Sequence, residues 1–156
     1  MNPNRIGEQL KELIPVTTHA LAALVPLLWW SSLQGEYSPV LIMGAIIVGN
    51  LPDLDTAYSR IGRVFYPIAK RIEIRFGHRA ITHSLLAVAI IVVLSFGICT
   101  LISNLIPELA SLISPWYWWP IFYASHLVLD MLVGGGTAIP LLWPLKHKFW
   151  FGLDIK

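Results

Sequence analysis

The sequence predicts an all-α integral membrane protein with four transmembrane helices, and composition and charge placement carry this prediction. The chain of 156 residues is 56% hydrophobic and 13% charged, whereas charged residues make up about a quarter of an ordinary soluble domain. The charges also gather in blocks, and long uncharged intervals separate these blocks. We therefore expect residues 1–156 to form a single membrane domain.

The candidate transmembrane helices are four apolar runs over residues 16–33, 37–51, 80–103 and 115–133. A spanning helix needs about 20 residues, so the second run lies in the length range where a span and a buried helix cannot be told apart. Within it, Ala45 and Gly49 stand four residues apart, a spacing of small residues that lets a neighbouring helix pack closely. Before the first run, residues 1–14 place apolar side chains at helical spacing, which predicts a short amphipathic helix on the membrane surface.

The connection between the second and third runs carries six Lys and Arg residues over 55–80. Apolar residues recur between these cations at helical spacing, which predicts an interfacial helix, bent or broken at Pro67, on an anionic leaflet. An ordinary basic loop is the alternative that this pattern leaves open. The other two connections carry no Lys or Arg, so the positive-inside rule puts the basic connection and both termini in the cytoplasm.

After the fourth run, glycines at 134–136 permit backbone conformations that other residues avoid. The apolar piece that follows these glycines is too short to span a membrane. It is flanked by Trp143, Trp150 and lysines, which anchor chains at membrane interfaces. We therefore expect a short re-entrant or interfacial C-terminal segment.

Most of the histidines and aspartates fall at one depth of the predicted bundle. Ionisable groups in membrane spans are costly and therefore indicate function. The residues that lie at or near the cytoplasmic end of a predicted span are His19, Asp53, Asp55, His78, Arg79, His83, His126 and Asp130. Because His126 and Asp130 are four residues apart, they share one helix face. We expect these side chains to meet at the cytoplasmic rim of the bundle.

The residue types in this cluster predict a metal site. Imidazole and carboxylate groups together bind zinc or manganese, whereas magnesium alone seldom recruits so many histidines. The cluster exceeds one tetrahedral shell, so one ion or two divalent ions remain open, and surplus groups would act as a base or orient the ligands. Arg79 has the geometry to bind a phosphate through two hydrogen bonds.

Six of these residues also have a purely structural interpretation. The structural alternatives are an interhelical hydrogen bond for His19, a structural pair for His126 and Asp130, helix caps or arginine partners for Asp53 and Asp55, and a topology anchor for Arg79. The shared depth of the whole set favours the metal site over these separate explanations.

Three ordered motifs carry a resemblance to a known family. They are GNLPDLD at 49–55, GHRAITHS at 77–84 and SHLVLD at 125–130, accompanied by Thr18-His19 and by LWP at 142–144. With these motifs the chain resembles a family of bacterial inner-membrane proteins described as membrane-bound metal-dependent hydrolases, some of whose members are under LexA (SOS) control. The resemblance implies a four-span helical protein of the inner membrane with hydrolase activity. It also implies metal binding by His19, Asp53, His83, His126 and Asp130, with Asp55, His78 and Arg79 beside them.

Two functional hypotheses follow from this cluster. The first is a metal-dependent hydrolase that acts at the cytoplasmic leaflet on a phosphoester or a lipid headgroup. A metal ion would activate water there, Asp55 or His78 would take the proton, and Arg79 would stabilise the developing charge. The second is a non-enzymatic membrane protein, a metal or proton conductor or a scaffold, that uses the same cluster. We expect membrane lipid as a partner and no nucleic acid, and the sequence leaves the oligomeric state open.

Overall fold

A computed structural model describes residues 3–34, 38–113, 115–133, 138–145 and 147–151, with side chains from residue 18 onward except that of Val133. The helices, in chain order, are α1 (Pro3–Gln34), α2 (Pro39–Val48), η1 (Leu51–Asp55), α3 (Arg60–Val64), α4 (Tyr66–Phe76), η2 (Ile81–His83), α5 (Leu85–Leu105), α6 (Pro107–Ile113) and α7 (Trp118–Val133). Over these ranges the extended backbone pairs in one antiparallel bridge, between Ile139 and Phe149. The described part of the chain is therefore all-α, as the sequence predicts.

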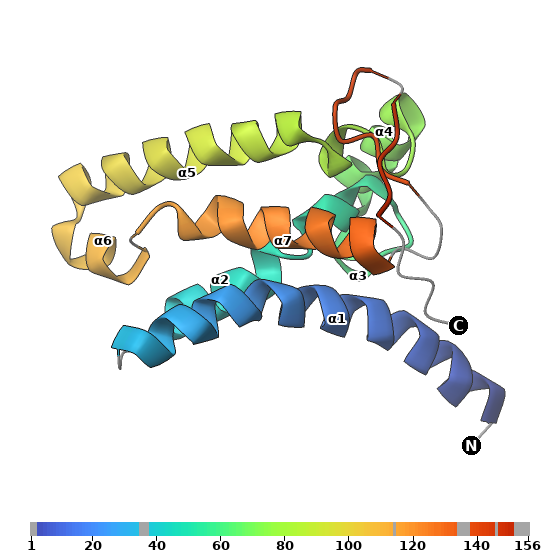
Figure 1. Cartoon of the computed structure of the whole chain (residues 1–156), viewed down its shortest axis with the longest axis horizontal. Helices are drawn as coiled ribbons and strands as arrows, with labels where there is room; N and C mark the ends of the chain where they lie inside the picture. Colours follow the sequence, from blue (N-terminus) through green and yellow to red (C-terminus); the bar gives the residue numbers. More distant parts are fainter. Residues whose placement is uncertain (1–2, 35–37, 114, 134–137, 146, 152–156) are drawn as a thin grey trace.

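Helix α7 lies at the centre of the bundle and packs against α1, α2 and α5 (Figure 1). One apolar cluster fixes α7 to its first two neighbours, and its buried members are Ala23, Leu27, Leu41, Ala45, Trp118 and Phe122. The start of α5, the end of α7 and the short helices α3 and α4 lie at one end of the bundle (Figure 1). The polar residues that the sequence predicts to form the site lie at this end.

Helices α1 and α2 differ from the predicted elements in length. The predicted surface helix over residues 1–14 and the predicted span over 16–33 form one continuous helix of 32 residues. Helix α2 has only ten residues, or about 15 Å of rise, which is half the thickness of a bilayer core. It ends early because Pro52 and the turn before it begin the 3₁₀ helix η1. A full span over residues 37–51 is therefore not confirmed.

Helix α5 is the described helix that is long and apolar enough to cross a membrane, judged by length and composition. It begins at Leu85, later than the predicted residue 80, because Ser84 caps its first turn by accepting a hydrogen bond from the N–H of Ala87. The predicted span over 115–133 corresponds to α7, whose 16 residues begin at Trp118. Four transmembrane helices are thus an expectation that the described helices do not confirm.

The basic connection forms two helices that meet at Phe65, beside the predicted break at Pro67. Proline fits here because it occupies the first turn of α4, where its missing N–H removes no helical hydrogen bond. Helix α4 ends at Gly77, whose φ of 82° lies in the left-handed region that glycine tolerates. Whether this connection lies on a membrane surface stays a prediction.

The C-terminal segment folds back onto the same end of the bundle. Its bridge residue Ile139 is fully buried, and the N–H of Leu85 donates to the carbonyl oxygen of Leu141 at 2.8 Å. The N–H of Phe151 donates to the carbonyl oxygen of Met131 at 3.0 Å, which joins the segment to α7. The predicted glycine run at 134–136 lies outside the described residues. Residues 138–145 therefore cover the start of α5 as a folded loop rather than as a re-entrant helix.

Candidate metal centre

Four segments that are far apart in the sequence deliver the predicted site residues to one end of the bundle. His19 comes from α1, Asp53 and Asp55 from η1, and His126 and Asp130 from α7. The remaining three residues, His78, Arg79 and His83, come from the connection between α4 and α5. Every one of the eight is within 4.0 Å of another member of the set. The prediction that these side chains meet is confirmed, whereas the role of each remains a prediction.

Three of the buried polar atoms without a hydrogen-bond partner face one another in this cluster. They are Nε2 of His83, Nε2 of His126 and Oδ2 of Asp130. Both nitrogens face the same carboxylate oxygen, at 3.3 Å from His83 and 3.8 Å from His126. Leaving a buried polar group unpaired costs about 1–3 kcal/mol, and native interiors contain few such groups. Three that converge on one point are the arrangement expected around a cation.

Asp53 completes this group of facing atoms. Its Oδ1 lies 3.6 Å from Nε2 of His126 and 4.0 Å from Nε2 of His83. Ligands about 2.0–2.2 Å from a tetrahedral zinc ion stand about 3.3–3.6 Å from one another. Four of the six separations among these atoms are 3.3 to 4.0 Å, at or slightly above this range. Asp53, His83 and His126 form one set of groups close enough to hold a metal ion, and Oδ2 of Asp130 adjoins both imidazoles.

The hydrogen bonds on the far side of each imidazole determine which nitrogen faces the centre. Nδ1 of His126 donates to the carbonyl oxygen of Gly49 at 2.8 Å. Nδ1 of His83 donates to Oδ2 of Asp55 at 3.1 Å. Because a carbonyl oxygen and a carboxylate accept these protons, the lone pair of each neutral ring lies on Nε2, which faces the other ligands. Metal-binding histidines are oriented by such contacts.

Asp55 binds the connection between α4 and α5 and does not face the group formed by Asp53, His83, His126 and Asp130. Its fully buried carboxylate accepts hydrogen bonds from Nδ1 of His78 at 2.9 Å, from the N–H of Arg79 at 2.7 Å, and from Oγ1 of Thr82 at 2.6 Å. Burial alone would raise the pKa of Asp55, but the hydrogen bonds from His78 and His83 outweigh it and lower this pKa well below its ordinary value. Asp55 therefore stays ionised and acts as a fixed acceptor.

The pKa values of Asp53 and His83, in contrast, are raised above their ordinary values. Burial raises the pKa of Asp53, although the nearby His19 and His83 oppose this rise. Burial lowers the pKa of His83, but the carboxylates of Asp130 and Asp55 outweigh it and raise this pKa to about 9. A metal ligand must be deprotonated, so metal binding at His83 has to displace a proton.

His19 and Arg79 both contact the second oxygen of Asp130. Nε2 of His19 and Nη2 of Arg79 each lie 3.3 Å from Oδ1, while Oδ2 faces the centre. The ring of His19 also stacks on the ring of His126, with 3.8 Å between the ring centroids. His19, His126 and Asp130 form a second set of groups close enough to bind an ion. Both sets contain His126, whose Nδ1 is engaged by Gly49, so they compete for its Nε2.

The backbone at Arg79 is held in an unusual conformation. Its φ of 53° lies in the left-handed region, which no other described non-glycine residue adopts. Such residues persist where surrounding contacts hold them, and they cluster at functional sites. Here the N–H of Arg79 donates to Asp55, so the carboxylate that orients His83 also fixes this turn.

Three positions outside the predicted site residues also shape the centre. The carbonyl of Gly49 accepts from His126, and a Cβ at Gly49 would lie 2.6 Å from the carbonyl oxygen of Ala45 and 2.7 Å from Cβ of Ala23. The hydroxyl of Tyr123 donates at 2.6 Å to the carbonyl oxygen of Thr82, whose own hydroxyl binds Asp55. The small-residue spacing of Ala45 and Gly49 indicated close helix packing, which is confirmed. No sequence signal distinguished Tyr123 from other aromatic residues in the apolar run.

Comparisons with known proteins find a family and several bacterial relatives. The family model of the YdjM inner membrane protein matches residues 14–155. Inner membrane protein YdjM of Escherichia coli (strain K12) is 34% identical over 131 residues, which cover 74% of this chain and 59% of that protein. Inner membrane protein YbcI of the same strain is 31% identical over 137 residues, which cover 87% of this chain and 70% of that protein.

A relative in a second organism also matches. Uncharacterized protein YvsG of Bacillus subtilis (strain 168) is 37% identical over 124 residues, which cover 77% of this chain and 68% of that protein. The chain spans about three fifths of the length of the YdjM protein that it matches. No solved structure matches the chain.

Proposed function

The chain belongs to the YdjM inner membrane protein family, and from this premise we propose that it is a membrane-bound, metal-dependent hydrolase. Its centre opens at the cytoplasmic leaflet of the bacterial inner membrane and acts on a phosphoester, which includes the headgroup of a lipid. The bundle of α1, α2, α5 and α7 lies in the membrane with both termini in the cytoplasm, and α2 enters to about half its depth. The cations of the basic connection support this orientation.

One observation carries the proposal above all others. Nε2 of His83, Nε2 of His126 and Oδ2 of Asp130 are buried without a hydrogen-bond partner and face one another. A structural hydrogen-bond network would satisfy these atoms among themselves or with backbone. Their convergence, together with Oδ1 of Asp53, supports one divalent ion held by these four residues. The prediction that His19 is a further ligand remains open, because His19 bonds Oδ1 of Asp130 and stacks on His126.

The chain supplies the remaining requirements for hydrolysis. A divalent ion, when bound, supplies Lewis-acid polarisation of the ester and a water of lowered pKa. Hydrolysis joins the water oxygen to phosphorus and breaks the ester P–O bond, while one proton of the water moves to the leaving oxygen. The pair of His78 and Asp55 suits this proton transfer, because the carboxylate orients an imidazole that is 49% exposed. Arg79, whose side chain is 24% exposed, is placed to bind a phosphate oxygen beside Asp130.

A phosphoester hydrolysis assay tests this function. The purified protein is loaded with zinc or manganese and incubated with p-nitrophenyl phosphate, bis-p-nitrophenyl phosphate and phospholipid vesicles, beside His78→Ala. We expect turnover that falls about 10²–10⁴-fold in His78→Ala, the contribution of one acid–base group, with metal content unchanged. His147→Ala is the matched control, because His147 is an exposed histidine outside the cluster. Metal-loaded protein that hydrolyses none of these esters, or ion flux into liposomes that requires His126, would contradict the proposal and favour a conductor.

A further inference from the structure

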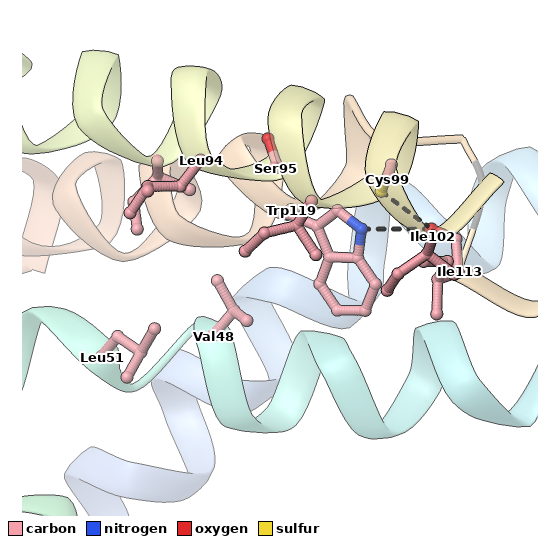
Figure 2. Close-up of a pocket in the computed structure, with 10 residues that line it drawn as sticks. Val48, Leu51, Leu94, Ser95, Cys99, Ile102, Ile113 and Trp119 are labelled. Atoms are coloured by element: carbon pink, nitrogen blue, oxygen red, sulfur yellow. Dashed lines mark hydrogen bonds between the residues drawn. The ribbon is translucent and has the colours of Figure 1, made fainter. Parts of the chain in front are cut away.

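An apolar cavity of about 270 Å³ separates α5 from α2 (Figure 2). Along α5 it is lined by residues at helical spacing from Ile91 to Ile102, which include Leu94, Ser95 and Cys99. Val48 and Leu51 lie across from this face, and Ile113 and Trp119 line the end near Cys99 and Ile102 (Figure 2). The cavity is partly open to the exterior. It is therefore an elongated groove within the helical bundle.

The length of this groove matches one membrane leaflet. Eleven residues of rise along α5, from Ile91 to Ile102, correspond to about 16 Å. A bilayer core about 30 Å thick gives each leaflet about 15 Å of hydrocarbon. The volume of 270 Å³ corresponds to about nine groups the size of a water molecule, each taking about 30 Å³. These dimensions suit a segment of one acyl chain.

The groove offers its occupant no polar partner. The hydroxyl of Ser95 donates within its own helix to the carbonyl oxygen of Val92 at 3.0 Å. The indole N–H of Trp119 donates to the carbonyl oxygen of Ile113 at 3.1 Å, and Sγ of Cys99 contacts the same carbonyl at 3.9 Å (Figure 2). Because apolar cavities without convergent polar groups do not hold water well, the occupant that fits is a hydrocarbon.

One end of the groove adjoins the candidate metal centre. Leu51 stands two residues before Asp53, and Val48, Leu51 and Ile91 pack against the cluster that contains Tyr123. Tyr123 in turn bonds the carbonyl of Thr82, next to His83. The far end lies towards α6. A molecule in the groove therefore has one end towards the metal ligands and the other towards α6.

The charges beside the near end favour an anionic headgroup. Arg79 stands at the centre itself, and α3 and α4, at the same end of the bundle (Figure 1), carry the cations Arg60, Arg63, Lys70, Arg71 and Arg75. Cations beside a membrane attract anionic lipids.

We propose that the groove between α2 and α5 binds one acyl chain of an anionic glycerophospholipid and so presents the phosphoester of its headgroup to the metal centre. As a statement about substrate, this inference rests on the proposed hydrolase function. As a statement about binding, it stands on the groove alone. The two parts are therefore measured separately.

The binding experiment uses phosphatidylglycerol with a photoactivatable diazirine in mid-chain, in phosphatidylcholine nanodiscs that contain the full chain. Mass spectrometry then locates the labelled residues. We expect label at Leu94, Ser95 and Cys99 in excess over Val93 and Phe96, although the latter two are 69% and 55% exposed on α5. An excess of unlabelled phosphatidylglycerol should remove this label. Equal labelling of the two faces of α5, or label that does not compete, would overturn the proposal.

A matched pair of variants tests occupancy without disturbing the core. Ile98 is 52% exposed at the groove, whereas Val93 is exposed on the same helix away from it. Ile98→Trp should abolish the competed label and Val93→Trp should leave it, with thermal unfolding as the folding control for both. Ser95→Phe, which points a ring into the groove, should repeat the loss. A label that survives both groove variants would refute the assignment.

The substrate experiment compares two esters in the same variants. Excluding about two methylenes from the groove weakens binding about tenfold, so Ile98→Trp should raise KM for dioleoyl phosphatidylglycerol about tenfold. Its turnover of p-nitrophenyl phosphate should not change, because this ester has no acyl chain. An equal KM for the lipid in Ile98→Trp and Val93→Trp would overturn the substrate assignment while the hydrolase function stands. If neither ester is hydrolysed, the hydrolase function and the substrate assignment fail together, and the labelling result still decides lipid binding.

Discussion

The hydrogen bonds of polar side chains differ between the apolar helices α5 and α6 and the end of the bundle that holds the metal centre. Along α5 and α6, the hydroxyls of Ser95, Ser103 and Ser111 donate to carbonyl oxygens three or four residues earlier in the same helix. At the end that holds the metal centre, side chains of the cluster also bond partners that are 23 to 111 residues away in the sequence, as His78 does to Asp55 and His19 to Asp130. Local bonds only neutralise a polar group in an apolar setting. Long-range bonds fix the relative positions of separate segments.

The two regions also differ in their buried polar atoms without a hydrogen-bond partner. Along the groove the hydroxyl, thiol and indole groups that line it each contact a carbonyl oxygen. At the polar end, a denser network still leaves Nε2 of His83, Nε2 of His126 and Oδ2 of Asp130 without a partner. These three atoms face one another, and we infer that an ion binds between them.

The largest effect is expected from His126→Ala. This change removes a facing nitrogen that belongs to both possible ligand sets, so the bound metal and the hydrolytic activity should both be lost. Elemental analysis and the phosphoester assay measure these losses. His147→Ala is the control. Retention of metal at the wild-type level in folded His126→Ala would remove His126 from the centre.

A smaller effect is expected from Asp55→Asn, which keeps the four facing ligands and alters what orients them. Changing such a supporting residue usually lowers metal affinity about 10–100-fold. The carboxylate of Asp55 accepts hydrogen bonds on both oxygens from His78, His83, Thr82 and the backbone N–H of Arg79. An amide has only one oxygen and no charge, so it cannot accept all of these hydrogen bonds. Competition with a zinc-sensitive chelator measures the affinity, and Glu73→Gln, at a carboxylate of α4 that pairs with Lys70 outside the cluster, is the control. Unchanged affinity would show that Asp55 only holds the turn.

Gly49→Ala tests the contact between α1 and α2 that positions the acceptor of His126. Its new Cβ would lie 2.7 Å from Cβ of Ala23 in α1, and overpacking of this kind costs about 1–3 kcal/mol. Gly97→Ala is the matched control, because a Cβ at Gly97 meets nothing within 4 Å. Thermal unfolding should show a lower Tm for Gly49→Ala alone. Equal Tm values would mean that the helices separate at little cost.

The smallest effect is expected from Tyr123→Phe, which removes the hydroxyl that bonds Thr82 and preserves the ring. Loss of one such hydrogen bond costs about 1 kcal/mol. The Tm should fall slightly, and metal affinity should fall with it because the bond supports the turn before His83. Tyr58→Phe, at a side chain that is 75% exposed, should change neither. A fall in Tm with constant metal affinity would limit Tyr123 to a structural role.

The sequence predicts the cluster better than it predicts the helices. The membership of the cluster follows from where charges interrupt apolar runs, because burial of an ionisable group is costly wherever it occurs. Helix lengths depend on local competition that hydropathy does not register. Pro52 and the 3₁₀ turn shorten α2 to ten residues. The cap at Ser84 makes α5 begin later than predicted, at Leu85. The division between ligands and supporting residues also could not be predicted, since Asp53 and Asp55 are near neighbours whose directions are set by the 3₁₀ helix.

The most direct test of this account is elemental analysis of the wild-type protein, purified in detergent without chelator and compared with Asp53→Asn and His83→Ala. We expect about one zinc or manganese ion per chain in the wild type, the number that one set of facing ligands holds, and much less in both variants. A folded wild-type chain that contains no divalent metal, and takes up none on addition of zinc or manganese, would contradict the account.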